Sequence, residues 1–496
     1  MQVLSTRGKT NAVPATQAVL KGIAADGGLF VPESFPQINL EEMQSYAAHE
    51  YDILAARVLR YFFDMDDAAL YEITQQAYGT FDVSQVVPIK RLTQSEYVME
   101  LTHGPTLAFK DMALQVLPRL IRRALDIHKQ HENVLILTAT SGDTGKAALA
   151  GFKDVARTAI EVFYPVDGVA DMQRLQMVTQ EGANVAVCGV KGNFDDAQTG
   201  VKALFADEDL KAYLKKAGYT FSSANSINFG RLIPQVAYYI YAYAKLAADG
   251  VITNGQKINF VVPTGNFGNI LAGYYAQRMG LPIGKLVCAS NENNVLTDFF
   301  NKNVYDANRE FHKTMSPSMD ILISSNLERL LFELAGRDAQ QVCALMESLG
   351  QNGKYEISAA AREQLNSLFW ADYCSEAETA ATIKSTFEKY NYLIDPHTAV
   401  AQCVCEKYKK ATGDDTLSVV VSTANPYKFT QDVLYSVSGE RVEDAFAAAE
   451  KLSALTGTSI PPQIAELRLK PIMHNECVET SGLNHAVREF IARMGD

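Results

Sequence analysis

Three short loops of small, polar residues follow apolar runs in the sequence, and each has a composition suited to binding an anion. They read TSGDTGKAA at residues 140–148, PTGNFGN at residues 263–269 and STANPYKF at residues 422–429. In open α/β sheets, ligands bind where parallel strands end and such loops begin. The three loops are therefore the first candidates for a binding site.

The loop at 263–269 is suited to a phosphate group. Gly265 and Gly268 let the chain turn tightly with N–H groups pointing inward, and a helix beginning near Asn269 adds the positive end of its dipole. The loop lacks the first G-x-G of the dinucleotide fingerprint and the Lys-Ser/Thr pair of a P-loop. Taken alone, it is better explained as a strand-to-helix turn with glycine caps.

The loop at 140–148 contains Gly145-Lys146 but is not a P-loop. Thr140 stands where a P-loop needs glycine, and Ala147 stands where it needs Ser or Thr. What remains is a helix start rich in hydroxyl and N–H groups, which suits a carboxylate. By itself, an ordinary helix cap is the simpler explanation.

Lys110 lies in the segment ELTHGPTLAFKDMALQ, beside Leu107, Ala108, Phe109 and Met112. Apolar surroundings lower the pKa of an ammonium group, which is what a Schiff-base lysine requires. For a lone lysine, the commoner explanation is that its aliphatic chain packs against the protein while its charged end reaches water.

Together, the three features are more specific than each is alone. A lysine in an apolar turn, a glycine-rich phosphate cup and a hydroxyl-rich helix start describe a site for pyridoxal phosphate. Lys110 would hold the aldehyde of this cofactor, the loop at 263–269 its phosphate, and the SGDTG turn the carboxylate of an amino acid.

Other chemistry is disfavoured, and no metal site is expected. His49 and His131 begin HE pairs but lack the second histidine of the zinc-protease helix. Cys403 and Cys405 lie on an Ala/Val-rich, helical run, where buried thiols are a better explanation than metal ligands. A G-x-S-x-G serine-hydrolase elbow is absent from the sequence.

The elements that must position these loops follow an α/β pattern. The apolar runs NVLILTAT, TAIEVFYP, NVAVCGV, KINFVVPT and TLSVVVST alternate with helical segments, which predicts one or two parallel sheets with crossover helices. Amphipathic runs at 41–61 and 66–78 predict helices near the N-terminus. The predicted division is a mostly helical N-terminal domain (1–95), a smaller α/β domain (96–250), a larger α/β domain (251–430) with a helical insertion (326–392), and a C-terminal extension (431–496).

Composition sets the class of partner. The 496 residues carry 45 Lys and Arg against 57 Asp and Glu, a net charge of −12, so nucleic acid and anionic membranes are poor partners. The seven cysteines are scattered and the first residues lack an apolar leader, which favours a reducing cytoplasm. The apolar runs are far shorter than the roughly 20 residues that cross a bilayer.

The sequence resembles the threonine synthases, pyridoxal-phosphate lyases with the tryptophan-synthase-β-like fold, also called fold type II. The resemblance spans nearly the whole chain and is to the longer microbial and fungal branch. It rests on STRG (5–8), DGGLFVPE (26–33), HGPTLAFKD (103–111), SGDTG (141–145), NSINFGRLIPQ (225–235), GNFGN (265–269) and DPHTAVA (395–401).

The resemblance implies a role for each part of the cofactor site. Lys110 is the catalytic lysine that binds the cofactor aldehyde, and Thr423 offers its hydroxyl to the pyridine nitrogen. A neutral hydroxyl there leaves that nitrogen largely unprotonated, which favours elimination over transamination. The cofactor phosphate is expected on Gly265, Asn266, Phe267, Gly268 and Asn269. Asn425 stands where the family usually has histidine, so no catalytic role is assigned to it.

The resemblance also implies two substrate sites. The substrate carboxylate is expected on the turn Ser141, Gly142, Asp143 and Thr144, and the substrate phosphate on Ser226, Asn228 and Arg231. Because Asp143 is itself anionic, we expect it to orient neighbouring donors.

The implied reaction converts O-phospho-L-homoserine and water to L-threonine and phosphate. The implied molecule has two α/β domains with the cofactor in the cleft between them, and the long branch suggests a monomer. Two alternatives remain open: another fold-type-II enzyme, such as a threonine dehydratase or cysteine synthase, and a threonine-synthase-like binding protein without catalysis.

Overall fold

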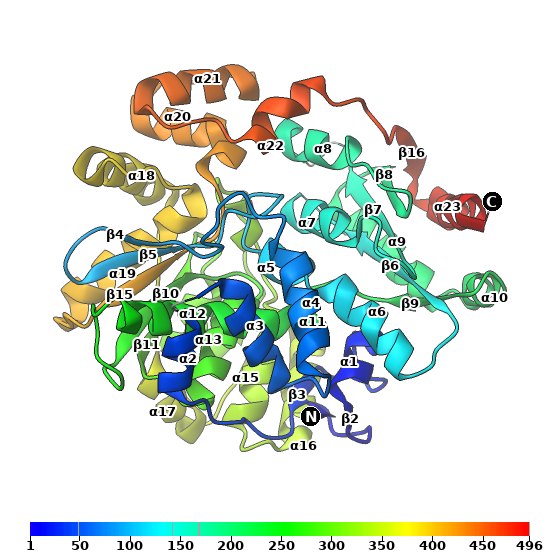
Figure 1. Cartoon of the computed structure of the whole chain (residues 1–496), viewed down its shortest axis with the longest axis horizontal. Helices are drawn as coiled ribbons and strands as arrows, with labels where there is room; N and C mark the ends of the chain where they lie inside the picture. The colour runs from blue at the N-terminus through cyan, green and yellow to red at the C-terminus, as the bar shows by residue number, and fades with distance from the viewer. Residues whose placement is uncertain (48, 141, 167–168, 496) are drawn as a thin grey trace.

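The computed structural model describes residues 1–47, 49–140, 142–166 and 169–495 of the chain. Two β-sheets lie on opposite sides of the molecule, with helices around both (Figure 1). The larger sheet has the strand order β14-β11-β10-β15-β5-β4, and only its β4–β5 pair is antiparallel among the described residues. The smaller sheet, β16-β8-β7-β6-β9, is parallel. The predicted α/β class is confirmed.

The strands are short, as the apolar runs predict. In the order just given, those of the larger sheet are Phe369–Tyr373, Ile283–Ser290, Ile258–Pro263, Ser418–Ser422, Glu96–Glu100 and Ile89–Arg91. Those of the smaller sheet are Glu476–Glu479, Val185–Lys191, Thr158–Pro165, Asn133–Ala139 and Tyr219–Ser222.

The smaller sheet is covered on both faces, which explains why its central strands are almost wholly apolar. Helices α6 (Leu117–Ile127) and α7 (Asp143–Phe152) pack on one face. Helices α9 (Phe194–Ala206) and α23 (Leu483–Gly495) pack on the other, where Phe490 of α23 is buried. The C-terminal helix is therefore part of this core.

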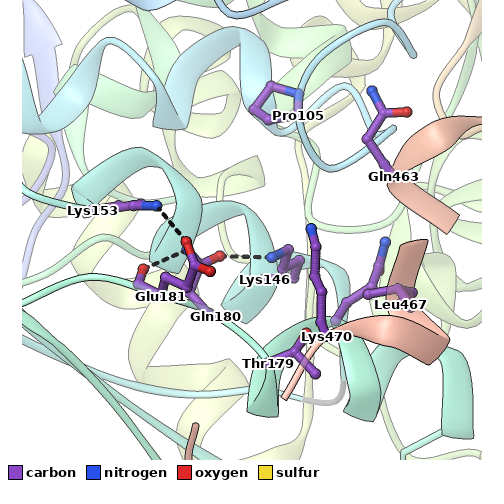
Figure 2. Close-up of a pocket in the computed structure, with 10 residues that line it drawn as sticks. Pro105, Lys146, Lys153, Thr179, Gln180, Glu181, Gln463, Leu467 and Lys470 are labelled. Carbon is purple, nitrogen blue, oxygen red and sulfur yellow. Dashed lines mark hydrogen bonds and ion pairs between the residues drawn. The ribbon is translucent and has the colours of Figure 1, made fainter. Parts of the chain in front are cut away.

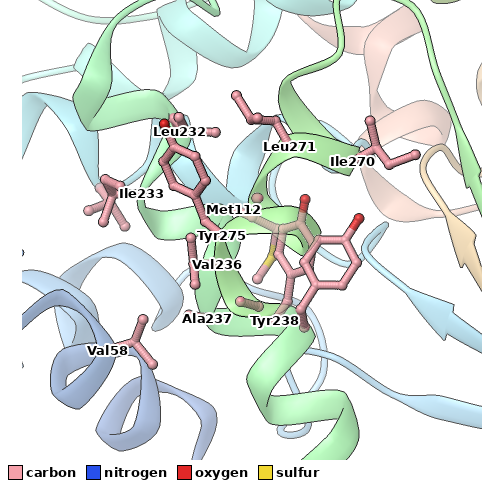
Figure 3. Close-up of a cluster of buried hydrophobic side chains, with 14 of the residues drawn as sticks. Val58, Met112, Leu232, Ile233, Val236, Ala237, Tyr238, Ile270, Leu271 and Tyr275 are labelled. Atoms are coloured by element: carbon pink, nitrogen blue, oxygen red, sulfur yellow. The ribbon is translucent and has the colours of Figure 1, made fainter. Parts of the chain in front are cut away.

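The main core surrounds α12 (Pro234–Ala248), which is buried almost all round. Figure 3 shows side chains of α12 beside those of α13 (Gly268–Arg278), α3 (Tyr51–Arg60) and α5 (Asp111–Leu114). On the far side of the larger sheet, α19 (Pro396–Thr412) buries Val400 and Val404 against the strands. This packing positions the start of α13, where the predicted phosphate loop ends.

The motifs STRG (5–8) and DGGLFVPE (26–33) hold the first strands to the rest of the protein. These strands, β1 (Gln2–Ser5), β2 (Val13–Pro14) and β3 (Phe30–Pro32), form a small sheet. The Ser5 hydroxyl donates to Asp26 at 2.7 Å, and Arg7 pairs with Glu328 of α15 at 3.1 Å. Their role in the fold is therefore structural.

The remaining elements surround these layers, and in the described ranges no helix is both long and apolar enough to cross a membrane. They are α1 (Ala15–Lys21), α2 (Leu40–Ala47), α4 (Asp67–Tyr78), α8 (Asp171–Val178), α10 (Glu208–Lys216), α11 (Phe229–Leu232), α14 (Val295–Lys302), β12 (Val304–Asp306), η1 (Pro317–Met319), α15 (Leu327–Leu334), α16 (Ala339–Asn352), β13 (Lys354–Glu356), α17 (Ala359–Leu368), α18 (Glu376–Tyr390), η2 (Pro426–Phe429), α20 (Thr430–Ser438), α21 (Ala445–Thr456), α22 (Pro462–Ala465), η3 (Glu466–Leu469) and η4 (Thr480–Gly482).

The strand pairing differs from the predicted domain division at three places. Strand β5, expected in the smaller domain, lies between β15 and β4 in the larger sheet. The C-terminal extension contributes β16 and α23 to the smaller sheet and its core. The segment 326–392, expected to be helical, contains β13 and the edge strand β14.

Strands β5 and β16 were hard to predict from the sequence because they contain charged residues. In β5, buried Glu96 accepts a hydrogen bond from Lys409 Nζ at 2.8 Å, and Glu100 accepts one from Tyr392 O–H at 2.8 Å. These partners are remote in sequence, so the pattern EYVME does not read as a buried strand. Strand β16 reads ECVE, which is too short and polar for a periodicity argument.

We predict that Phe490→Ala destabilises the protein by about 3–5 kcal/mol, because it leaves a cavity beneath the smaller sheet. The urea midpoint of the first unfolding transition measures the effect. Glu489→Ala, at an exposed position of the same helix, is the control and should change stability by about 0.5 kcal/mol or less. Equal midpoints for both variants would show that α23 is not part of the core.

Candidate active site

Lys110 is buried at the start of α5, as its apolar neighbours suggest. Its Nζ donates to Ser318 Oγ at 3.0 Å and lies 3.8 Å from Asp143 Oδ2. Burial lowers the pKa of Lys110 to about 8, against the attraction of Asp143 and with added repulsion from Arg231 and Lys428. The amine is thus much closer to neutrality at physiological pH than an exposed lysine.

The turn that carries Lys110 is hydrogen-bonded to the residues that follow β15. Phe109 N–H donates to Thr423 O at 2.9 Å, and Asn425 N–H donates to Leu107 O at 3.0 Å. Leu107 has a φ of 60°, a left-handed conformation that a leucine rarely adopts. These bonds place Thr423, which is buried, beside the lysine turn, as the resemblance implies.

Asp111 shapes the same turn from the other side. Its carboxylate accepts hydrogen bonds from the Thr106 N–H and hydroxyl, both at 2.8 Å. Burial raises the pKa of Asp111 to about 6 despite these bonds. A Cβ on Gly104 would lie 2.5 Å from Asp111 Oδ2, so this position requires glycine.

The glycine-rich loop between β10 and α13 has the form of an anion cup. Gly265 O accepts from Ser324 Oγ at 2.8 Å, and Asn266 O accepts from Asn326 Nδ2 at 2.9 Å. In a trans peptide the next N–H points opposite to the carbonyl, so the N–H groups of Asn266 and Phe267 point away from these anchors. Phe267 has a φ of 64°, and α13 begins directly after it at Gly268.

Asn269 adds a donor that has no partner. Its Oδ1 accepts from the hydroxyls of Tyr238 and Tyr239, both at 2.7 Å, which fixes the orientation of the amide. Its Nδ2 is buried without a hydrogen-bond acceptor among the described residues. A buried donor of this kind calls for an acceptor, and an anion in the cup would supply one.

The SGDTG turn begins α7. Ser141 lies outside the described residues. Thr140 Oγ accepts from the N–H groups of Gly142 and Gly145 at 3.1 and 3.0 Å, which holds the turn in place. A Cβ on Gly142 would lie 2.4 Å from Gln173 Oε1. Thr144 follows in the first turn of the helix.

Asp143 pairs with two buried lysines. Lys428 Nζ lies 3.0 Å from Asp143 Oδ1, and Lys110 Nζ lies 3.8 Å from Oδ2. Although burial favours the protonated acid, Lys428, Lys110 and His397 hold the pKa of Asp143 well below its usual value. Asp143 therefore holds Lys110 as a counter-ion, and its predicted contact with a substrate carboxylate stays a prediction.

The predicted substrate-phosphate residues surround α11. Arg231 is buried, its Nη1 donates to Ala224 O at 2.9 Å, and its Nε has no partner among the described residues. Burial lowers the pKa of Arg231 to about 10. Ser226 Oγ accepts from Asn326 Nδ2 at 3.2 Å, and that same amide contacts the phosphate cup at Asn266 O. Asn326 thus joins the two segments predicted to bind phosphate groups.

Asn228 differs from the expectation. Its Oδ1 accepts from Gly230 N–H at 2.8 Å, and its Nδ2 donates to Val19 O and Ser223 O at 3.0 and 2.7 Å. No amide donor remains for a phosphate. Asn228 is the cap of α11 and so positions Arg231, because an asparagine at this position satisfies the free N–H groups of a helix start.

The sequence analysis missed several residues that hold the site. Ser318 N–H donates to His397 Nε2 at 3.2 Å, and His397 Nδ1 lies 2.7 Å from Asp395 Oδ2. Lys428 Nζ donates to Thr106 O at 2.7 Å. Arg329, fully buried, contacts Asn326 and Phe30 O. Two signals were available: Lys428 lies in the loop at 422–429, after a strand, and Asp395 and His397 lie in the motif DPHTAVA.

These groups fit pyridoxal phosphate. The aldehyde would meet the Lys110 amine, the phosphate would meet the cup and the orphaned Asn269 Nδ2, and Thr423 lies beside the turn that carries Lys110. Ser318 links the lysine to the cup, because its Oγ accepts from Lys110 Nζ and its carbonyl O would lie 2.9 Å from a Cβ on Gly265.

Comparisons with known proteins find relatives over most of the chain. The profile of the family described as "Threonine synthase N terminus" matches residues 2–78, and that of "Pyridoxal-phosphate dependent enzyme" matches residues 84–363. The threonine synthase of Pseudomonas aeruginosa is 39% identical over 463 residues, covering 92% of this chain and 96% of that protein. Threonine synthase-like 1 of Homo sapiens is 39% identical over 95% of this chain, which spans 64% of that relative's length.

Solved structures give the same result. A pyridoxal-phosphate-bound threonine synthase from Brucella melitensis superposes with a TM-score of 0.89 at 36% identity, over 99% of both chains. The threonine synthase from yeast superposes with a TM-score of 0.89 at 32% identity, again over 99% of both chains. The expected fold type II architecture is confirmed.

We predict that Lys110 is acylated through a titration centred near pH 8, because only the neutral amine reacts. At pH 7, about a tenth of Lys110 would be neutral, against about 0.04% of an ordinary lysine. Protein freed of cofactor would be treated with acetic anhydride across pH 6–11 and analysed by mass spectrometry. Exposed lysines in the same digest are the internal control, and a midpoint for Lys110 above pH 10 would contradict the prediction.

Proposed function

The chain belongs to the threonine synthase family of pyridoxal-phosphate-dependent enzymes, and we propose that it converts O-phospho-L-homoserine and water to L-threonine and phosphate. This makes it a carbon–oxygen lyase acting on phosphates. The observation that carries the proposal is a pair of neighbouring segments suited to binding anions. They are the cup at Gly265–Asn269 and the Ser226–Arg231 segment, which are joined through Asn326. A substrate with its own phosphate requires two such groups.

Pyridoxal phosphate, when bound, supplies an electron sink for negative charge at the carbons of a bound amino acid. In the proposal, Lys110 binds its aldehyde, and Gly265, Asn266, Phe267, Gly268 and Asn269 bind its phosphate. Thr423 presents a hydroxyl to its pyridine nitrogen. Because that hydroxyl is neutral, it does not hold a proton on the ring nitrogen as a carboxylate would.

The substrate would be held at both ends. Its carboxylate would meet the helix start at Gly142 and Thr144, where N–H groups and a hydroxyl are available. Its phosphate would meet Ser226 and Arg231, and Asn228 would act by positioning the helix that carries Arg231. The buried, unpartnered Arg231 Nε supports this role, since a buried guanidinium donor gains most from a charged acceptor.

Lys110 is the group proposed to move protons. With substrate bound, the Lys110 amine would take the proton from Cα and then from Cβ. Ser318 and Asp143 hold Nζ in place, and the pKa of about 8 lets the amine both accept and return a proton near neutral pH. Phosphate would leave from Cγ beside the positive charge of Arg231, and a proton returned by Lys110 would make Cγ the methyl carbon. The hydroxyl of water would then add at Cβ, and a proton would return to Cα.

Two alternatives are less well supported. A threonine dehydratase or cysteine synthase would use the cofactor cup but would not need the Ser226–Arg231 group. A threonine-synthase-like protein without catalysis would be expected to lose Lys110 or Arg231, and both are present and buried in the site. A monomer in the cytoplasm is proposed for the working enzyme, and the seven free cysteines support a reducing compartment.

We predict that purified protein with pyridoxal phosphate forms threonine and phosphate from O-phospho-L-homoserine in equal amounts, and that Lys110→Ala abolishes both. Coupled phosphate release and amino-acid analysis measure the products. Lys384→Ala, at an exposed position of α18, is the control and should keep full activity. Ammonia release from threonine without turnover of phosphohomoserine would support the dehydratase alternative.

We predict that Arg231→Ala raises the KM for O-phospho-L-homoserine about 10–100-fold, because a hydrogen bond to a charged group contributes about 1.5–3 kcal/mol. Steady-state kinetics with the wild type and Arg122→Ala, an exposed arginine on α6, provide the comparison. An unchanged KM and kcat in Arg231→Ala would remove this residue from the substrate site.

A further inference from the structure

A second basic site lies outside the active site. A cavity of about 120 Å³ opens between α7, α8 and the C-terminal segment α22–η3 (Figure 2). Lys146, Lys153 and Lys470 line it, with Gln180 and Gln463 between them. Neither Lys110 nor any residue of the cup at Gly265–Asn269 contributes to its wall.

Among the described residues, Lys146 is the one lysine of this lining without a carboxylate partner, because Lys470 pairs with Glu466 at 3.7 Å and Lys153 pairs with Glu181. Lys146 Nζ donates to Gln180 Oε1 at 2.6 Å, and among the described residues no carboxylate lies within 4 Å of it. Burial, followed by repulsion from Lys470 and Lys428, lowers the pKa of Lys146 to about 7. Lys153 pairs with Glu181 at 3.3 Å, the one carboxylate of the lining. An anion in the cavity would relieve this repulsion.

The polar groups of the wall point to a phosphate group. Lys146 and Lys153 come from α7 and its C-terminal end, and Lys470 comes from the C-terminal segment. Amines that converge from two segments suit a compact, multiply charged oxyanion better than a single carboxylate, since lysine binds phosphate as a point charge. Gln463 Oε1 is buried without a donor, and a hydroxyl on the phosphate or on its ester would supply one.

The cavity also joins two parts of the fold. Lys146 and Gln180 belong to the smaller domain, whereas Gln463 and Lys470 come from the C-terminal segment beside α8 (Figure 1). This segment is fastened to α8 by few bonds, among them Met473 N–H to Val178 O at 2.8 Å. A ligand held by Lys146 and Lys470 would therefore strengthen the docking of the C-terminal segment on the smaller domain.

We propose that this cavity binds a phosphate group, either free phosphate or a small phosphate monoester, through Lys146, Lys153 and Lys470. Bound phosphate clamps residues 462–474 onto α8. The site is distinct from the proposed substrate and cofactor sites, because none of its three lysines belongs to them, and it adjoins the active site through Gln176, which accepts a hydrogen bond from Lys428 at 3.3 Å.

Hydrogen exchange of the holoenzyme tests the proposal. Inorganic phosphate and sn-glycerol 3-phosphate would each be titrated at constant ionic strength, and exchange of peptides covering residues 462–474 would be followed by mass spectrometry. We expect saturable protection in the wild type, and about tenfold weaker binding in Lys146→Gln and in Lys470→Gln, equivalent to about 1.4 kcal/mol. Tighter binding of the ester would identify a monoester as the ligand, and equal or tighter binding of inorganic phosphate would identify free phosphate.

Two controls separate this site from the active site and from salt effects. Lys451→Gln, on exposed α21, should bind as the wild type does. Arg231→Ala should also keep the protection, whatever its effect on turnover. Absence of protection, or equal protection in the wild type and Lys146→Gln, would overturn the proposal, whereas loss of protection only in Arg231→Ala would assign the effect to the active site.

Discussion

The structure depends most on the buried carboxylate of Asp143 between two buried ammonium groups. Lys110 comes from the turn before α5, Asp143 from the start of α7 and Lys428 from the segment after β15, so one charge cluster joins the smaller sheet to the larger. Removing Asp143 would leave two ammonium groups out of water without a carboxylate, which costs several kcal/mol. The two lysines keep Asp143 ionised, whereas burial lowers the pKa of Lys110 to about 8 against the attraction of Asp143.

Around this cluster, the functional loops are held by residues that do not touch a ligand. Arg329 is fully buried and contacts Asn326, which in turn contacts Ser226 and Asn266. Asn228 caps the helix that carries Arg231, and Tyr238 and Tyr239 orient Asn269. Binding groups fixed in this way lose little freedom when a ligand arrives, so the protein meets the ordering cost during folding.

The C-terminal segment contributes to both the fold and the second basic cavity. Strand β16 extends the smaller sheet, α23 covers one of its faces, and Lys470 reaches the cavity beside α8. The last sixty or so residues are thus not an appendage of the α/β core, and their docking is a natural point at which a bound anion could act on the smaller domain.

The sequence alone determined the central strands at 133–139, 158–165, 185–191, 258–263 and 418–422, the loops after them and the lysine turn, because apolar runs and glycines report local burial and backbone shape. Motif resemblance determined the family. Only the tertiary structure decided that β5 lies in the larger sheet, that Asn228 is a cap and that Lys428 neutralises Asp143. The place of β5 and the pairing of Lys428 depend on partners far away in the chain, and Asn228, whose cap bond to Gly230 is local, also donates to the remote Val19 O. No local pattern records a remote partner.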